Sequence, residues 1–142
     1  MVPYAFVELL GGPTIVGEPL TNDLQLVDMI QRGVRRKAFD YLAKRSNLPL
    51  PILTAAVDLS VRTLQRYAPE QRLRADTTDR LVQLAMLYAE GFELFGEEKF
   101  KRWMESPLPT LGNRQPVEFI TSTVGIQLLR DIFVRIEHGV FG

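Results

Sequence analysis

The chain has 142 residues, enough for one ordinary domain or two very small ones, with 46% hydrophobic residues, 24% charged residues and a formal net charge of zero. This composition predicts a folded globular protein and excludes a uniformly basic nucleic-acid coat. The chain has no cysteine and a single histidine, His138, which excludes thiolate zinc sites, cysteine nucleophiles and multi-histidine metal sites. We therefore expect a protein without metal, cofactor or catalytic activity.

No apolar run approaches the roughly 20 residues that a membrane-spanning helix needs. The first 30 residues contain neither lysine nor arginine, so the basic region of a secretory signal is absent. We expect a cytoplasmic protein that makes no membrane contact.

The zero net charge hides an uneven distribution. Residues 31–80 hold eleven basic and five acidic residues, residues 1–30 hold four acidic and no basic ones, and residues 81–142 hold six basic and eight acidic ones. A basic middle third predicts contact with a polyanion there. The alternative is a solvated helix face that happens to be rich in arginine.

Glycine and proline punctuate residues 1–22, which predicts an extended or loosely structured arm. A short helix is expected over residues 23–31, ending at Gly33, and an amphipathic helix over residues 34–46. Pro51 suits the first turn of the next helix, which continues to Val57.

Residues 58–60 form a tight connection, and Ser60 is expected to cap a helix over residues 61–67. A long amphipathic helix begins near residues 76–78, any of which is a candidate cap, and stops near Gly96. Its predicted apolar face consists of Leu81, Leu84, Ala85, Tyr88, Phe92 and Phe95.

A further helix is expected over residues 97–104, with Phe100, Trp103 and Met104 facing the core. The last helix spans residues 122–137, and its spacing predicts a buried row stepping by four, widened by two neighbours: Val124, Leu128, Ile132 and Ile136, with Leu129 and Phe133 beside them. No strand pattern is convincing, so the fold class is predicted to be all-α.

Two short helices joined by three residues, the second rich in arginine, fit a helix-turn-helix. Val61, Leu64 and Ala68 share a face that seats the second helix on the core, and the polar side chains face outward, where guanidinium groups can reach guanine or phosphate. The expected DNA contacts are Ser60, Arg62, Thr63, Gln65, Arg66, Arg72 and Arg74. The alternative is a plain helical hairpin with exposed arginines.

Two positions depart from the usual pattern of this motif. Asp58 stands in the turn, where glycine is common, and Thr54 stands where alanine is usual. Both departures bear on DNA binding.

Catalytic arrangements are not supported. Glu93 and Glu97 lie near helix ends, where acids serve as caps, and the neighbours Glu137 and His138 point about 100° apart on a helix, so they form no dyad.

A series of short motifs resembles the Xre/MbcA/ParS antitoxin family, the antitoxins of RES–Xre toxin–antitoxin pairs. The resemblance covers about residues 40–142. Its motifs are Arg62-Thr63-Leu64-Gln65-Arg66, Asp79-Arg80-Leu81, Glu93-Leu94-Phe95-Gly96, Trp103-Met104, Ser106-Pro107, Leu111-Gly112, Pro116, Gly125 and the segment 135–141.

The resemblance implies a two-part antitoxin of a type II system. An N-terminal helix-turn-helix (Xre/homeodomain-like) part, residues 31–90, would bind operator DNA and repress its own operon. A small helical domain, residues 91–142, would bind a RES-domain toxin that consumes NAD or uses it to modify proteins. The family forms homodimers and even-numbered toxin–antitoxin complexes. Residues 1–30 are an arm of unknown function, expected to be dispensable for toxin binding.

In this family the end of the antitoxin lies at or in the active site of the toxin, so the resemblance implies occlusion by the last residues. The expected toxin contacts are Leu111, Arg114, Arg135, Glu137, His138, Gly139, Val140, Phe141 and Gly142. A frayed end is the alternative for the tail. A stand-alone helix-turn-helix regulator without a toxin partner is the alternative for the whole chain.

Overall fold

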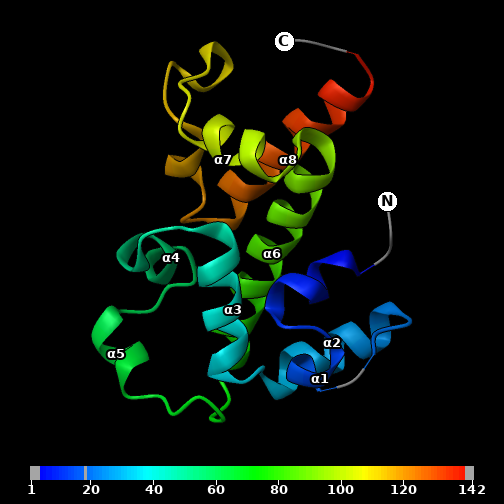
Figure 1. Cartoon of the computed structure of the whole chain (residues 1–142), viewed down its shortest axis with the longest axis vertical. Coiled ribbons are helices and arrows are strands. Elements are labelled where there is room, and N and C mark those ends of the chain that lie inside the picture. The colour runs from blue at the N-terminus through cyan, green and yellow to red at the C-terminus, as the bar shows by residue number, and fades with distance from the viewer. Residues whose placement is uncertain (1–3, 18, 140–142) are drawn as a thin grey trace.

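A computed structural model describes residues 4–17 and 19–139, and this part of the chain is helical without a named strand (Figure 1). The all-α prediction is confirmed. The elements are η1 (Ala5–Leu10), α1 (Pro13–Val16), α2 (Asp23–Arg32), α3 (Arg36–Ser46), α4 (Leu50–Ala56), α5 (Val61–Gln65), α6 (Ala75–Phe95), α7 (Glu97–Met104), η2 (Pro109–Leu111), η3 (Pro116–Phe119) and α8 (Thr123–Glu137), where η marks a 3-10 helix.

The helix α6 runs the length of the molecule and contacts both halves of it. It packs against α2, α3, α4 and η1 as well as against α7 and α8 (Figure 1). The predicted apolar face is confirmed, since Leu81, Leu84 and Tyr88 are buried. The predicted capping residue is wrong, because the residue before the helix is Arg74, and Thr78 is instead buried with its hydroxyl accepting a hydrogen bond from the Val34 amide.

The N-terminal segment is part of the core, and the prediction of an extended arm is wrong. The helix η1 packs against both α3 and α6. It buries Phe6, Val7, Leu9 and Leu10, and Val16 of α1 is buried as well. Apolar side chains spaced over a 3-10 turn followed by two glycines show neither helical nor strand periodicity, so the pattern was not visible in the sequence.

Aromatic rings fill the space between α6, α7 and α8. The Trp103 ring stacks on Phe95 with centroids 5.2 Å apart and lies 5.4 Å from the ring of Phe133. Phe100 is fully buried beside them. This cluster fixes α7 and α8 on the second half of α6, so the part after Gly96 is a rigid unit.

The helix α8 begins after Ser122, close to the predicted start, and the Ser122 side chain accepts a hydrogen bond from the Gly125 amide. The predicted buried row is confirmed at Ile132 and wrong at its first two residues. Val124 is 79% exposed and Leu128 38%, whereas Leu129 and Phe133 are buried. The helix is therefore rotated from the predicted orientation, because Phe133 enters the aromatic cluster.

In the described part of the chain, no helix combines the length and apolar character needed to cross a membrane.

Candidate DNA-binding and partner-binding surfaces

The helices α4 and α5 form the predicted helix-turn-helix. In the turn between them, Asp58 has a left-handed backbone with φ of 57°, and the amide of Leu59 donates to the carbonyl of Thr54. Aspartate is among the few residues other than glycine that visit this region. The Thr54 side chain is buried and its hydroxyl lies 3.0 Å from the carbonyl oxygen of Leu50. Both departures from the usual pattern are thus accommodated.

Ser60 caps α5 as predicted, because its hydroxyl accepts a hydrogen bond from the Thr63 amide at 3.0 Å. Leu64 is buried and seats the helix on the core. The predicted contact of Ala68 with the core is wrong, since α5 ends at Gln65 and Ala68 is exposed.

The predicted DNA-contacting side chains of α5 are gathered on one exposed surface. Arg62, Thr63, Gln65 and Arg66 are all exposed. Two guanidinium groups beside a hydroxyl and an amide can form hydrogen bonds with base edges and phosphates.

The loop over residues 66–74 is bound to the start of α3. The amide of Arg36 donates to the carbonyl of Gln71, the amide of Lys37 to that of Pro69, and Nη1 of Arg36 to that of Tyr67. These contacts satisfy free amides in the first turn of α3. They also fix the end of α5 relative to α3, and so orient the exposed residues of α5.

Two of the predicted DNA contacts lie in this loop and already have partners. Arg72 donates from Nη1 to the carbonyl of Gly33 at 2.8 Å, and its backbone pairs with that of Arg35. Arg74 lies 3.1 Å from the carboxylate of Asp76, and the hydrogen bond to this carboxylate raises the pKa of Arg74. Both residues hold the loop, and whether they also reach phosphate stays a prediction.

Among the predicted toxin contacts, two lie in the loop after α7 and support it. The Leu111 side chain is buried. The guanidinium of Arg114 lies 4.7 Å from the centre of the Phe119 ring, and its Nε donates to the carbonyl of Leu111. The Leu111 side chain is therefore not accessible to a partner in this conformation, whereas Arg114 is exposed.

The end of α8 presents several polar candidates together. Arg135 and Glu137 are exposed on the last turn, and His138 and Gly139 follow them. The remaining candidates Val140, Phe141 and Gly142 lie outside the described residues.

Sequence analysis missed an exposed apolar surface on α8. Val124, Leu128 and Val134 are exposed, at 79%, 38% and 54%. The four-residue step identified Val124 and Leu128 as apolar, but the side of the helix that meets the aromatic cluster depends on contacts remote in the sequence.

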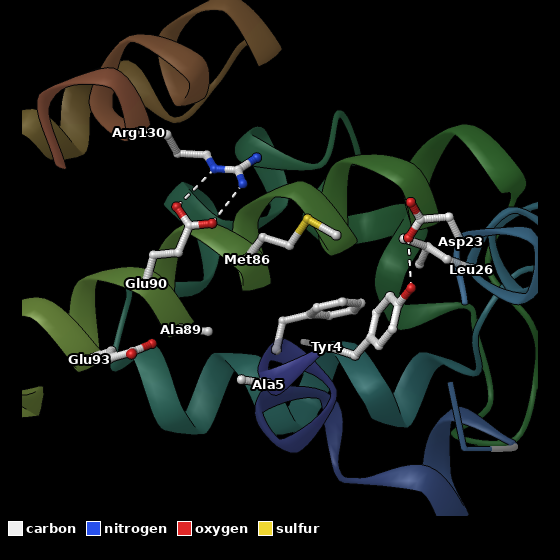
Figure 2. A pocket seen from close by; sticks show the side chains of 10 residues that line it. Tyr4, Ala5, Asp23, Leu26, Met86, Ala89, Glu90, Glu93 and Arg130 are labelled. Carbon is white, nitrogen blue, oxygen red and sulfur yellow. Dashed lines mark hydrogen bonds and ion pairs between the residues drawn. The ribbon is translucent and has the colours of Figure 1, made fainter. Parts of the chain in front are cut away.

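A cavity of about 250 Å³ lies between the N-terminal segment, α2, α6 and α8 (Figure 2). Met86 forms part of its wall. Tyr4 donates a hydrogen bond to Asp23 at 2.7 Å, and Arg130 of α8 forms two hydrogen bonds with Glu90 of α6, at 2.9 and 2.6 Å. The pair of Tyr4 and Asp23 joins the N-terminal segment to α2, and the pair of Arg130 and Glu90 joins α8 to α6.

Sequence comparison identifies both halves of this arrangement. Residues 25–86 match the Antitoxin Xre-like helix-turn-helix domain, and residues 90–139 match the Antitoxin Xre/MbcA/ParS C-terminal toxin-binding domain. The chain belongs to the Xre/MbcA/ParS antitoxin family. The two matched segments meet within α6, so one continuous helix carries both domains.

Relatives named Antitoxin Xre extend the similarity over most of the chain. The one from Yersinia enterocolitica is 27% identical over 129 residues, which cover 89% of this chain and 87% of the relative. The one from Pseudomonas putida is 30% identical over 83 residues, 57% of this chain and 52% of the relative. Membership of the family with both domains makes this protein an antitoxin with a DNA-binding and a toxin-binding part.

Proposed function

We propose that the protein neutralises a RES-domain toxin by binding it and occluding its active site, and that it binds operator DNA to repress its own operon. The observation that carries this proposal is the joining of an exposed, arginine-bearing α5 to a matched toxin-binding domain through the single helix α6. The division into residues 1–30, 31–90 and 91–142 is part of the proposal, although η1 packs within the helix-turn-helix part.

The operator would be bound by α5. Arg62 and Arg66 are exposed beside Thr63, and a homodimer would present two such helices to two half-sites of one duplex. Replacing either arginine by alanine is expected to weaken operator binding by about 1–3 kcal/mol and relax specificity at one position. Unchanged affinity for the DNA upstream of its own reading frame in both variants would contradict this assignment.

The toxin would be bound by the domain at residues 90–139, in an even-numbered complex built on the homodimer. Arg114, Arg135, Glu137 and His138 supply exposed polar groups there. The carboxylate of Glu137 at the end of α8 can pair with arginines that would otherwise hold the phosphates of NAD in the toxin.

Occlusion of the active site would depend on the tail, with Val140 and Phe141 as the apolar plug beside Gly142. Deleting residues 139–142 is expected to leave the unfolding temperature and the dimer unchanged and to weaken neutralisation in a growth assay. Full protection of cells by the truncated protein would mean that the domain surface alone inhibits the toxin.

A stand-alone transcription regulator remains the second candidate, because the helix-turn-helix would serve it equally well. The match of residues 90–139 to a toxin-binding domain favours the antitoxin.

A further inference from the structure

Glu70 lies in the loop after α5 and pairs with two cations of another element. Its Oε2 is 3.3 Å from Nε of Arg35, and its Oε1 accepts a hydrogen bond from Nζ of Lys37. The Glu70 side chain is 66% exposed, while those of Arg35 and Lys37 are each 29% exposed. A single exposed carboxylate therefore neutralises two positive charges at the start of α3.

The position of this group relates it to the DNA-binding surface. The loop that carries Glu70 follows α5 directly and passes the end of the molecule where α3 begins (Figure 1). The side chains of Arg62 on α5 and of Arg66, the residue after α5, are exposed, and within the described part of the chain neither guanidinium forms a hydrogen bond or ion pair. The loop that follows these two arginines thus carries a carboxylate that neutralises two further cations, of which Arg35 also donates a hydrogen bond to the carbonyl of Ile15.

Cations that reach phosphate supply most of the affinity for DNA of any sequence, because each phosphate contact releases counterions. Base contacts supply the discrimination between sequences. A carboxylate that neutralises cations near the recognition helix lowers the affinity that comes from phosphate contacts. It leaves the discrimination that comes from base contacts unchanged. It also repels phosphate directly.

We propose that Glu70 limits the DNA affinity of the helix-turn-helix domain: by neutralising Arg35 and Lys37 it weakens phosphate binding on any sequence and leaves sequence recognition to α5. This proposal rests on operator binding by α5. The lowered pKa of Glu70, caused mainly by the hydrogen bond from Lys37, keeps the carboxylate charged at neutral pH.

The test compares Glu70→Gln with the wild-type full chain by fluorescence anisotropy, on a duplex from upstream of its own reading frame and on a shuffled duplex, over a salt series. We expect affinity for the shuffled duplex to rise about fivefold, the Coulomb factor for one unit charge near a phosphate in water. The slope of log affinity against log salt should steepen by about one to two, for the two released cations. Affinity for the upstream duplex should rise by a similar factor, because the phosphate contribution is common to both duplexes.

Two controls separate this role from a change of net charge. Glu98→Gln removes an exposed carboxylate of α7, on the other domain, and should change neither affinity nor salt slope. In a Lys37→Met background, Glu70→Gln should gain less, because one of the two cations is missing. Glu70→Ala, also at an exposed site, repeats the test if the glutamine variant is poorly folded by circular dichroism.

Equal gains for the Glu70 and Glu98 variants, or a gain that Lys37→Met leaves intact, would overturn the proposal. The proposal would also be overturned if the wild-type protein prefers its upstream duplex and Glu70→Gln has the same affinities and salt slope. Operator binding by α5 would stand in that case. If the wild-type protein and the Glu70 variants all fail to prefer the upstream duplex, both the operator function and this inference fail.

Discussion

Gly91 lies at the closest contact between α6 and the aromatic cluster. A Cβ atom built at this position would lie 2.3 Å from Cε1 of Phe100, whose ring is fully buried. Glycine is a poor helix residue, at about 1 kcal/mol relative to alanine. Its place in the middle of α6 is explained by the ring that occupies the space of a side chain.

We expect Gly91→Ala to lower the free energy of unfolding by about 1–3 kcal/mol despite the better helix propensity, because the buried ring must shift. Urea unfolding measures this. Phe100→Leu should cost less in the Gly91→Ala background than alone, since the smaller side chain makes room for the methyl group. Increased stability of the single alanine variant would contradict the packing described above.

The contact that Arg72 makes could not be predicted from the sequence. Its basic character and nearness to α5 predicted a phosphate contact, but its guanidinium donates to the carbonyl of Gly33, 39 residues away. Leu111 was similarly predicted at an interface and is buried. The cap Ser60 was predicted correctly, because a cap depends on residues two or three positions away.

At the scale of elements, the helices from α2 to α8 were predicted within a few residues, and α7 with its exact bounds. These helices have strong periodicity or clear end signals. The segment before α2 has neither, and its structure depends on burial against α3 and α6. Burial against distant elements likewise set the rotation of α8.

The N-terminal segment should therefore be needed for folding. Leu10 is completely buried, so Leu10→Ala should lower the free energy of unfolding by about 2–5 kcal/mol. Glu8→Ala, an exposed position in the same 3-10 helix, is the matched control and should change it by less than about 0.5 kcal/mol. Comparable denaturant midpoints for Leu10→Ala and the wild type would restore the interpretation of this segment as a dispensable arm.

The exposed row of α8 should act in binding and not in folding. Val124→Asn removes an apolar side chain that is 79% exposed, so stability should stay within about 0.5 kcal/mol of the wild type. Binding of the toxin, measured by calorimetry, should weaken if the proposed partner covers this face. Thr121→Asn, at another exposed position close to α8, controls for the added amide. Undiminished affinity of the Val124 variant would exclude this row from the interface.

At the scale of the whole molecule, α6 joins a basic DNA-binding part to a slightly acidic toxin-binding part. Arg45 of α3 and Glu97 of α7 add an ion pair across the junction, with Nη2 and Oε1 2.7 Å apart. The sequence indicated the two parts through the distribution of charge and the motifs after Gly96. The predicted long helix ending near Gly96 already crossed the predicted boundary between residues 90 and 91, but a helix pattern says nothing about which elements pack on each part of the helix.

The central claim is that one chain carries two separable functions, and co-expression with the product of the neighbouring toxin gene tests it most directly. Growth rescue and repression of the operon promoter are measured for the wild type and for an Arg62→Ala/Arg66→Ala variant. We predict that both proteins rescue growth, and that only the wild type represses the promoter, because the two arginines are exposed on α5 and remote from residues 90–139. Failure of the wild-type protein to rescue growth would contradict the antitoxin function, and full repression by the variant would contradict DNA recognition by α5.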